Sequence, residues 1–163
     1  MTKILAINAG SSTLKWKLFS VPEETVIASG MVDRLGLPES VFKIKKADGT
    51  KYSETKDNID TKEAAAMVLT RLKSDNIVEH LSDITGIGHR VVAGGEEFKD
   101  SLVITPETLK QIKDLSEYAP LHNPTQAYYI EVFRDLLPKA VQVAVFDTSL
   151  YSDMPKVNYL YSI

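Results

Sequence analysis

Short apolar runs separated by polar turn residues dominate the first third of the chain. Five of these runs alternate apolar and polar positions or stay apolar over the length of a strand, which favours β-structure; they cover residues 4–7, 14–19, 25–32, 41–46 and 51–55. Between the last two runs, Ala47-Asp48-Gly49-Thr50 predicts a hairpin, because Asp-Gly accepts the positive φ that such turns require. The first third is therefore predicted to be β-rich.

Apolar residues recur at helical spacing in three later segments. The first helix is predicted to begin with Thr61 as its N-cap. Thr105-Pro106 predicts the start of a second helix, since proline is favoured at the first helical position. Asn123-Pro124-Thr125-Gln126 predicts a third helix, in which Gln126 returns a hydrogen bond to the capping residue. This third helix is expected to run to about Leu137.

Two further strand candidates alternate with these helices. They cover residues 84–92 and 141–146, and the second is a near-continuous apolar run, as expected for a strand buried on both faces. Strands come first along the chain, and helices and strands then alternate. This order predicts an α/β domain with a mixed sheet and helices packed on it.

The composition is that of an ordinary globular domain. The 163 residues are 44% hydrophobic and 25% charged, and a chain of this size can bury a substantial core. A net charge of −3 gives no general electrostatic case for binding nucleic acid or an anionic membrane. The absence of cysteine excludes disulfides and thiolate chemistry and fits a cytoplasmic location, and no apolar run has the length of a membrane span.

The segment between the first two predicted strands, residues 8–15, has the donors of a phosphate-binding turn. Gly10 permits unusual backbone angles and leaves room for a phosphate, and successive backbone N–H groups can form an anion-binding concavity. Ser11, Ser12 and Lys15 add hydroxyl donors and a positive charge. Asn8 offers a neutral oxygen to Mg²⁺ or to an Mg²⁺-bound water. The pattern is not a Walker P-loop, and an ordinary hairpin turn is the alternative.

Three further segments place polar groups at the ends of apolar runs. They are residues 88–96, 119–124 and 145–148, with the sequences GHRVVAGGE, APLHNP and VFDT. Together with residues 8–15 they closely resemble the acetate kinases, in order and over essentially the whole chain. The resemblance implies the ribonuclease H-like fold of the sugar kinase, Hsp70 and actin superfamily. It also implies the reversible, Mg²⁺-dependent conversion of ATP and acetate to ADP and acetyl phosphate by direct phosphoryl transfer.

Arg90 is the candidate substrate-binding residue. Its guanidinium fork matches a carboxylate or phosphate bidentately, and it lies between an apolar strand and the Gly-rich turn at 94–95. A surface ion pair is the alternative role for such an arginine. The resemblance implies that Arg90 binds the substrate carboxylate and phosphoryl group. It further implies that Val92 and Leu121 line the small pocket for the acetate methyl group.

Asp147 and His122 are the candidate catalytic residues. Asp147 follows the apolar run 141–146, at a place where carboxylates commonly face ligands, and the resemblance implies a catalytic acid or base. Because a carboxylic acid substrate is already ionised at neutral pH, we interpret Asp147 as an orienting group or a ligand to Mg²⁺ or its waters. His122 precedes a predicted helix start, where anions are favoured. The resemblance implies that His122 contacts the transferring phosphoryl group and that Lys15 lies near the nucleotide phosphates.

Other positions are predicted to be structural or depart from the family pattern. His89 neighbours Arg90 on a strand and therefore faces the opposite side, so we expect it to be structural. His80 is expected to be exposed. The family usually has His where this chain has Ala93, and Ala-Phe-His where it has residues 149–151. These departures affect the expected substrate preference and the packing at the cleft.

The chain is expected to supply one part of a larger enzyme. Residues 1–153 are predicted to form the N-terminal domain, and residues 154–163 to begin the connection to a second domain that holds the nucleotide pocket. The full-length protein is expected to be a homodimer, and the fragment alone to be inactive. A propionate kinase of the same fold is one alternative. A non-catalytic regulatory or interaction domain derived from a kinase half is the other.

Overall fold

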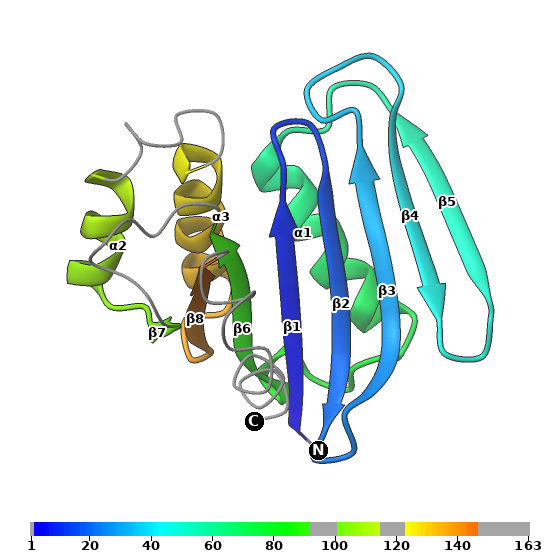
Figure 1. The fold of residues 1–163 in the computed structure, drawn as a ribbon. Helices are drawn as coiled ribbons and strands as arrows, with labels where there is room; N and C mark the ends of the chain where they lie inside the picture. The colour runs from blue at the N-terminus through cyan, green and yellow to red at the C-terminus, as the bar shows by residue number, and fades with distance from the viewer. Residues whose placement is uncertain (1, 92–100, 115–122, 147–163) are drawn as a thin grey trace.

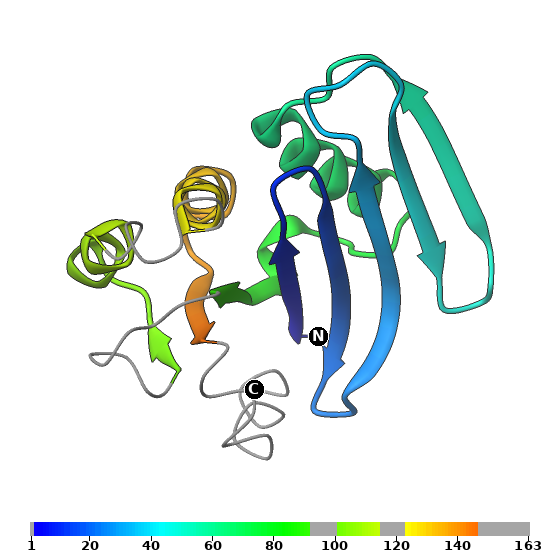
Figure 2. The same cartoon turned by 45° about the horizontal axis from the view of Figure 1, so that its top comes forward.

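A single mixed sheet organises the molecule. The computed structural model describes residues 2–91, 101–114 and 123–146. Eight strands lie in the order β5-β4-β3-β2-β1-β6-β8-β7. Figures 1 and 2 show the α-helices on one face of this sheet. The predicted α/β architecture, a mixed sheet with helices packed on it, is confirmed.

The elements follow the predicted apolar runs closely. The strands are β1 (Thr2–Ala9), β2 (Leu14–Val21), β3 (Thr25–Asp33), β4 (Ser40–Lys46), β5 (Lys51–Lys56), β6 (Ile84–Val91), β7 (Leu102–Val103) and β8 (Val141–Phe146). The helices are α1 (Thr61–Ser74), α2 (Pro106–Asp114) and α3 (Asn123–Leu136), with a short 3-10 turn, η1 (Leu81–Asp83).

The sheet has an antiparallel half and a mainly parallel half. Strands β1 to β5 form an antiparallel meander, whereas β6 pairs parallel with β1, and β8 pairs parallel with β6. The predicted hairpin between β4 and β5 is confirmed, since Gly49 has a φ of 90°. The Asp48 carboxylate accepts a hydrogen bond from the Thr50 N–H at 2.8 Å, which closes this turn.

Helix α1 is capped one residue earlier than predicted. The Asp60 carboxylate accepts a hydrogen bond from the Glu63 N–H at 2.7 Å, so Asp60 is the N-cap and the assignment to Thr61 is wrong. Both residue types cap helices well. The aspartate also places a negative charge next to the positive end of the helix dipole, which stabilises the first turn.

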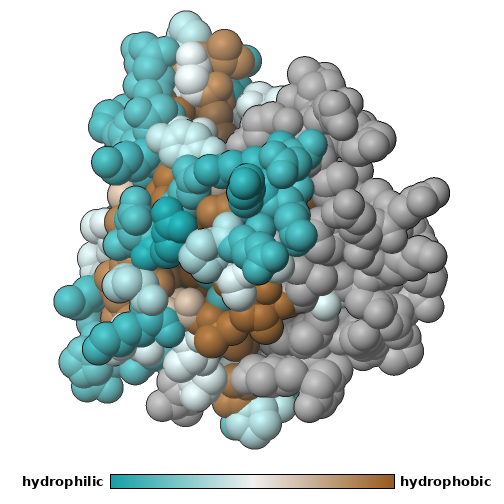
Figure 3. Space-filling model, turned by 90° about the vertical axis from the view of Figure 1, so that its left-hand side faces the viewer, coloured by the Kyte–Doolittle hydropathy of each residue, from teal (hydrophilic) through white to brown (hydrophobic). Residues whose placement is uncertain are grey.

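The outer edge of the parallel half differs from the prediction. Ala144 and Val145 face opposite sides of β8 and are both fully buried, as expected, but Val141 at the start of this strand is 52% exposed. Strand β7, which was not predicted, covers β8 on its outer side over two residues only. Figure 3 looks onto the edge that carries α2, where hydrophobic surface lies between hydrophilic side chains.

The core lies between the sheet and helices α1 and α3. Fully buried apolar side chains from both layers meet there, including Leu5, Leu18, Leu72 and Phe133. A second cluster joins α2 to α3, β6 and β8; it consists of Val91, Leu109, Ile112, Ala127, Ile130 and Ala144. These two clusters fix the helices against one face, so the end of each strand has a defined position relative to α3.

Gly30 of β3 makes room for the single tryptophan. Trp16 of β2 pairs with Gly30 in the sheet and is 2% exposed. A Cβ atom at Gly30 would lie 2.7 Å from Trp16 Cζ2 and 2.4 Å from the Lys43 carbonyl oxygen. Because that carbonyl belongs to the paired backbone of β4, it has little freedom to move away. A larger residue at this position therefore forces the strands or the indole to shift.

We expect Gly30→Ala to lower the free energy of unfolding by roughly 1–3 kcal/mol, the usual range for overpacking a core. Chemical denaturation followed by the fluorescence of Trp16 measures the change. Ser29→Ala, at the neighbouring half-buried position, is the matched control and should change this free energy by less than about 0.5 kcal/mol. An unaltered denaturation midpoint in Gly30→Ala would show that the close approach of Trp16 is not required.

Candidate functional site

The carboxyl ends of three parallel strands meet at one edge of the sheet. The pairing of β1 with β6 extends to Ile7 and His89, and that of β6 with β8 extends to Val91 and Phe146. Ligands of open α/β sheets bind outside such strand ends. The residues that follow these pairs are therefore the ones to inspect for a binding site.

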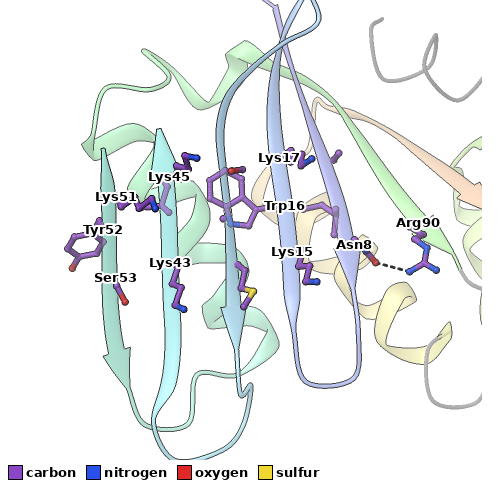
Figure 4. A pocket seen from close by; sticks show the side chains of 16 residues that line it. Asn8, Lys15, Trp16, Lys17, Lys43, Lys45, Lys51, Tyr52, Ser53 and Arg90 are labelled. Atoms are coloured by element: carbon purple, nitrogen blue, oxygen red, sulfur yellow. Dashed lines mark hydrogen bonds between the residues drawn. The ribbon is translucent and has the colours of Figure 1, made fainter. Parts of the chain in front are cut away.

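Arg90 and Asn8 lie at these strand ends and contact each other. Arg90 Nη1 donates a hydrogen bond to Asn8 Oδ1 at 3.2 Å (Figure 4). Arg90 is half-buried and Asn8 is exposed. The bond orients the guanidinium towards the end of β1. It also engages the Asn8 oxygen, the atom that we predicted to lie near Mg²⁺.

The turn between β1 and β2 presents backbone donors beside this pair. The Gly10 N–H donates to the Thr13 carbonyl at 2.8 Å, and the Ser12 carbonyl accepts from the Leu35 N–H at 3.0 Å. Within the described part of the chain, the N–H groups of Ser11 and Ser12 donate to no protein acceptor, and both residues are exposed. The turn thus offers two N–H groups and two hydroxyls to an anion.

Gly10 leaves space for the Thr13 hydroxyl in this turn. Its φ lies outside the positive region that Gly36 and Gly49 occupy, so the turn does not use the backbone freedom that glycine permits. A Cβ atom at this position would lie 3.0 Å from Thr13 Oγ1. Any side chain at residue 10 would therefore press on the Thr13 hydroxyl and on the turn.

Helix α3 begins beside the same turn. Gln126, which is 2% exposed, donates from Nε2 to the Ala9 carbonyl at 3.5 Å. Its predicted bond back to the cap of α3 stays a prediction, and the contact with β1 was not anticipated. Figure 1 shows the start of α3 at the same end of the molecule as the β1–β2 turn. The N-terminus of this helix, which favours anions, is thereby tied to the candidate site.

The open face of the sheet next to these residues is a basic hollow of about 900 Å³. Besides Asn8 and Arg90, its described lining holds no Asp or Glu and five lysines from three strands, namely Lys15, Lys17, Lys43, Lys45 and Lys51 (Figure 4). Lys15 lies directly opposite Asn8 in the pairing of β1 with β2. Lysine stems can cover apolar surface while their ammonium groups stay in water. The hollow therefore combines apolar surface with positively charged side chains.

On the helix side of the sheet, His89 belongs to a buried network of hydrogen bonds. Its Nε2 atom lies 2.5 Å from Gln142 Oε1, and Gln142 Nε2 donates to the Ile130 carbonyl of α3 at 3.1 Å. Burial lowers the pKa of His89 to about 4, against the smaller opposing effect of the hydrogen bond with Gln142. His89 is 2% exposed and lies on the face opposite Arg90, as predicted.

The described part of the predicted site gathers at one sheet edge. The residues brought together there are Asn8, Gly10, Ser11, Ser12, Lys15 and Arg90. The predicted residues Val92, Leu121, His122 and Asp147 lie outside the described residues, as do Ala93 and residues 149–151. Sequence reasoning missed Gln142 and the contact of Gln126 with β1, because the sequence near a glutamine does not indicate a hydrogen-bond partner far along the chain.

Neither a metal-binding cluster nor a membrane-spanning helix is found in the described part of the chain. Across residues 2–91, 101–114 and 123–146, no three His, Cys, Asp or Glu side chains are grouped so as to hold a metal ion. Among the helices that the structure describes, none has the length and apolar character needed to cross a membrane.

Solved kinases share this fold. The crystal structure of Porphyromonas gingivalis acetate kinase matches with a TM-score of 0.86 and 38% identity, over 96% of this chain and 40% of that one. A propionate kinase from Francisella tularensis subsp. tularensis SCHU S4 matches with a TM-score of 0.85 and 32% identity, with the same shares covered. The fold is therefore that of the acetate and propionate kinases, and the ribonuclease H-like class expected from the sequence is confirmed.

Sequence comparison identifies the family. The model of the Acetokinase family matches residues 3–163. Acetate kinase 1 of Latilactobacillus sakei subsp. sakei (strain 23K) is 63% identical, and the acetate kinase of Enterococcus faecalis (strain ATCC 700802 / V583) is 54% identical, over all of this chain. The chain belongs to the Acetokinase family. It spans 41% of the length of these curated relatives.

We expect acid to destabilise the fold through His89. The folded pKa is about 4 and the ordinary value is 6.5, so between these pH values the unfolded chain binds a proton that the folded chain does not. The free energy of unfolding should therefore fall as the pH drops from 6.5 to about 4, by up to roughly 3 kcal/mol. Denaturant titrations at a series of pH values measure this slope.

Two histidine variants assign the slope to its residue. His89→Asn removes the titrating imidazole and should flatten the slope. His80→Gln, at a side chain that is 68% exposed, should keep the wild-type slope. A slope that persists unchanged in His89→Asn would mean that other groups cause the loss of stability.

Proposed function

We propose that this chain is the N-terminal part of an acetate kinase that interconverts ATP and acetate with ADP and acetyl phosphate. The observation that carries the proposal is the contact of Arg90 with Asn8 beside the β1–β2 turn, in a chain of the Acetokinase family. A guanidinium and exposed backbone N–H groups at the ends of β6 and β1, with Lys15 opposite Asn8, suit an anionic substrate and a phosphate chain.

Arg90 and the turn hold the anions in this proposal. Arg90 binds the substrate carboxylate and the phosphoryl group with its planar fork. Lys15, Gly10, Ser11 and Ser12 bind the nucleotide phosphates through the ammonium group, the backbone and the two hydroxyls. Phosphoryl transfer depends mainly on positioning and on neutralising charge, and fixed donors on paired strands provide both.

Four residues outside the described ranges complete the proposed site. His122 contacts the transferring phosphoryl group, Asp147 acts as an orienting group or as acid or base, and Val92 and Leu121 line the methyl pocket. Two observations support their placing. Asp147 directly follows β8, which pairs with the strand that carries Arg90. His122 directly precedes α3, whose first turn contacts the end of β1.

Mg²⁺ is the proposed metal. The Asn8 carbonyl oxygen and the hydroxyls of Ser11 and Ser12 are neutral oxygen donors, which Mg²⁺ accepts directly or through its waters. When bound with a nucleotide, the ion would neutralise phosphate charge. Such a donor set fits a Mg²⁺ ion that keeps several waters and is held mainly by the phosphates.

The remaining part of the enzyme is proposed to supply the other wall of the cleft. We propose residues 1–153 as the N-terminal domain, with residues 154–163 leading to a second domain that binds the adenosine group. The chain spans 41% of its relatives, which leaves room for such a domain in a full-length protein. We propose a homodimer in the cytoplasm for the full-length enzyme. Residues 1–163 alone should then show no kinase turnover.

A propionate kinase is the second candidate, because the Francisella propionate kinase matches this fold almost as well as the Porphyromonas acetate kinase does. The two substrates differ by one methylene group, which typically changes kcat/KM by about 10- to 200-fold. Comparing kcat/KM for acetate and propionate with the full-length gene product decides between them. Absence of turnover with either acid would favour the non-catalytic alternative.

In the full-length gene product, we expect Arg90→Lys to lower kcat/KM for acetate by roughly 100-fold. Lysine keeps the charge but loses the fork, and one charge-assisted contact in a transition state typically contributes a few kcal/mol. A steady-state assay measures the change. Arg134→Lys, at an exposed position of α3, is the matched control and should leave kcat/KM unchanged. A loss below about threefold for Arg90→Lys would reject the substrate role of Arg90.

We expect residues 1–163 alone to bind inorganic phosphate weakly, with a Kd of about 1 mM, and not to bind adenosine. The anion donors are present, but an open half-cleft leaves the anion largely hydrated. Chemical-shift titration should move the signals of Ser11, Ser12 and Arg90 with phosphate and none with adenosine. Saturable adenosine binding, or phosphate shifts confined to other surfaces, would contradict the assignment.

A further inference from the structure

The buried network of hydrogen bonds that includes His89, the neighbour of Arg90, connects three elements. His89 lies on β6, Gln142 on β8, and the Ile130 carbonyl on α3. The His89 ring also packs against Phe133 of α3, with ring centroids 6.0 Å apart. His89 and Gln142 are both almost fully buried. No other side-chain hydrogen bond in the described part of the chain joins β6 to β8.

These two hydrogen bonds determine which ring nitrogen of His89 carries the proton. A carbonyl oxygen only accepts, so the atom of Gln142 that faces the Ile130 carbonyl must be the Nε2 donor. The opposite amide atom, Oε1, then faces His89 and can only accept. The His89 Nε2 atom must therefore carry the proton, and in the neutral ring Nδ1 carries none.

The register of β6 is set from its helix-facing side, where Ile87, His89 and Val91 are all buried. On its open face, Arg90 is preceded at alternate positions by Gly86 and Gly88, which have no side chain to pack. A slip by one residue would move Arg90 into the core and His89 to the open face. The directional bonds of His89 penalise this slip, since it would leave the buried Gln142 oxygen without a donor.

We propose that His89 is a positioning residue that, as the Nε2–H tautomer bonded to Gln142, locks β6 against β8 and α3 and so holds Arg90 beside Asn8. The importance of Arg90 for substrate rests on the proposed function, whereas the locking of β6 does not. His89 and Arg90 are neighbours on opposite faces of the strand, so the buried bond of His89 sets the position of the half-buried Arg90 side chain.

Nuclear magnetic resonance of the chain tests both parts without substrate. Long-range proton–nitrogen spectra above pH 7 should show His89 protonated at Nε2. The Asn8 carboxamide signal reports the contact with Arg90, and Arg90→Ala gives its value when the contact is lost. Gln142→Met, which keeps the side-chain length but removes both polar atoms, should move the Asn8 signal towards that value. Gln142→Glu keeps an acceptor for His89 and should restore the wild-type Asn8 signal in part or in full.

Phe133→Leu is the matched control. It alters a side chain that packs on the His89 ring but takes no part in the hydrogen bonds, so it should change stability and leave the Asn8 signal in place. An Nδ1–H tautomer in the wild type would overturn the proposal. So would a folded Gln142→Met with the wild-type Asn8 signal. If Gln142→Met does not fold, Gln142→Glu provides the test. The proposal is overturned if this variant keeps neither the proton on His89 Nε2 nor the wild-type Asn8 signal. A kinase assay in which Arg90→Lys has no effect would reject the substrate role alone.

Discussion

Strand β1 is the element on which the candidate site depends, since it pairs antiparallel with β2 on one side and parallel with β6 on the other. The antiparallel pairing requires a short turn after Ala9, and this turn supplies the exposed donors of Ser11 and Ser12. The parallel pairing brings the end of β6, with Arg90, to the same place. A wholly antiparallel or wholly parallel sheet would supply one of these features without the other.

Net charge is a poor guide to the surface beside this site. The chain as a whole has a net charge of −3. Side chains two residues apart in a strand share a face, and this rule puts Lys15 with Lys17, and Lys43 with Lys45, on the open side of the sheet. The described lining of the hollow therefore holds five lysines and no carboxylate, although the chain as a whole is acidic.

The part of the fold that could be predicted is the part that short segments encode. Alternating apolar positions gave most strands, and Asp-Gly gave the hairpin, because both act over a few residues. The cap of α1 was misplaced since Asp60 and Thr61 are adjacent and both residue types cap helices. The local sequence does not indicate long-range contacts. Gln126 donates to an acceptor 117 residues away, and Arg90 donates to Asn8, which is 82 residues away. The residue types of the site were therefore predictable, and their contacts were not.

The contact of Arg90 with Asn8 explains why a site on strand ends suits this chemistry. Both residues belong to paired backbones, and their hydrogen bond orients the guanidinium before a ligand arrives. Ordering a mobile side chain at the moment of binding would use part of the binding free energy, and a fixed fork avoids that loss. A guanidinium presents its N–H donors in a planar fork that matches the geometry of a carboxylate or a phosphate. A lysine ammonium could neutralise the same charge, but it would not hold the anion in one plane.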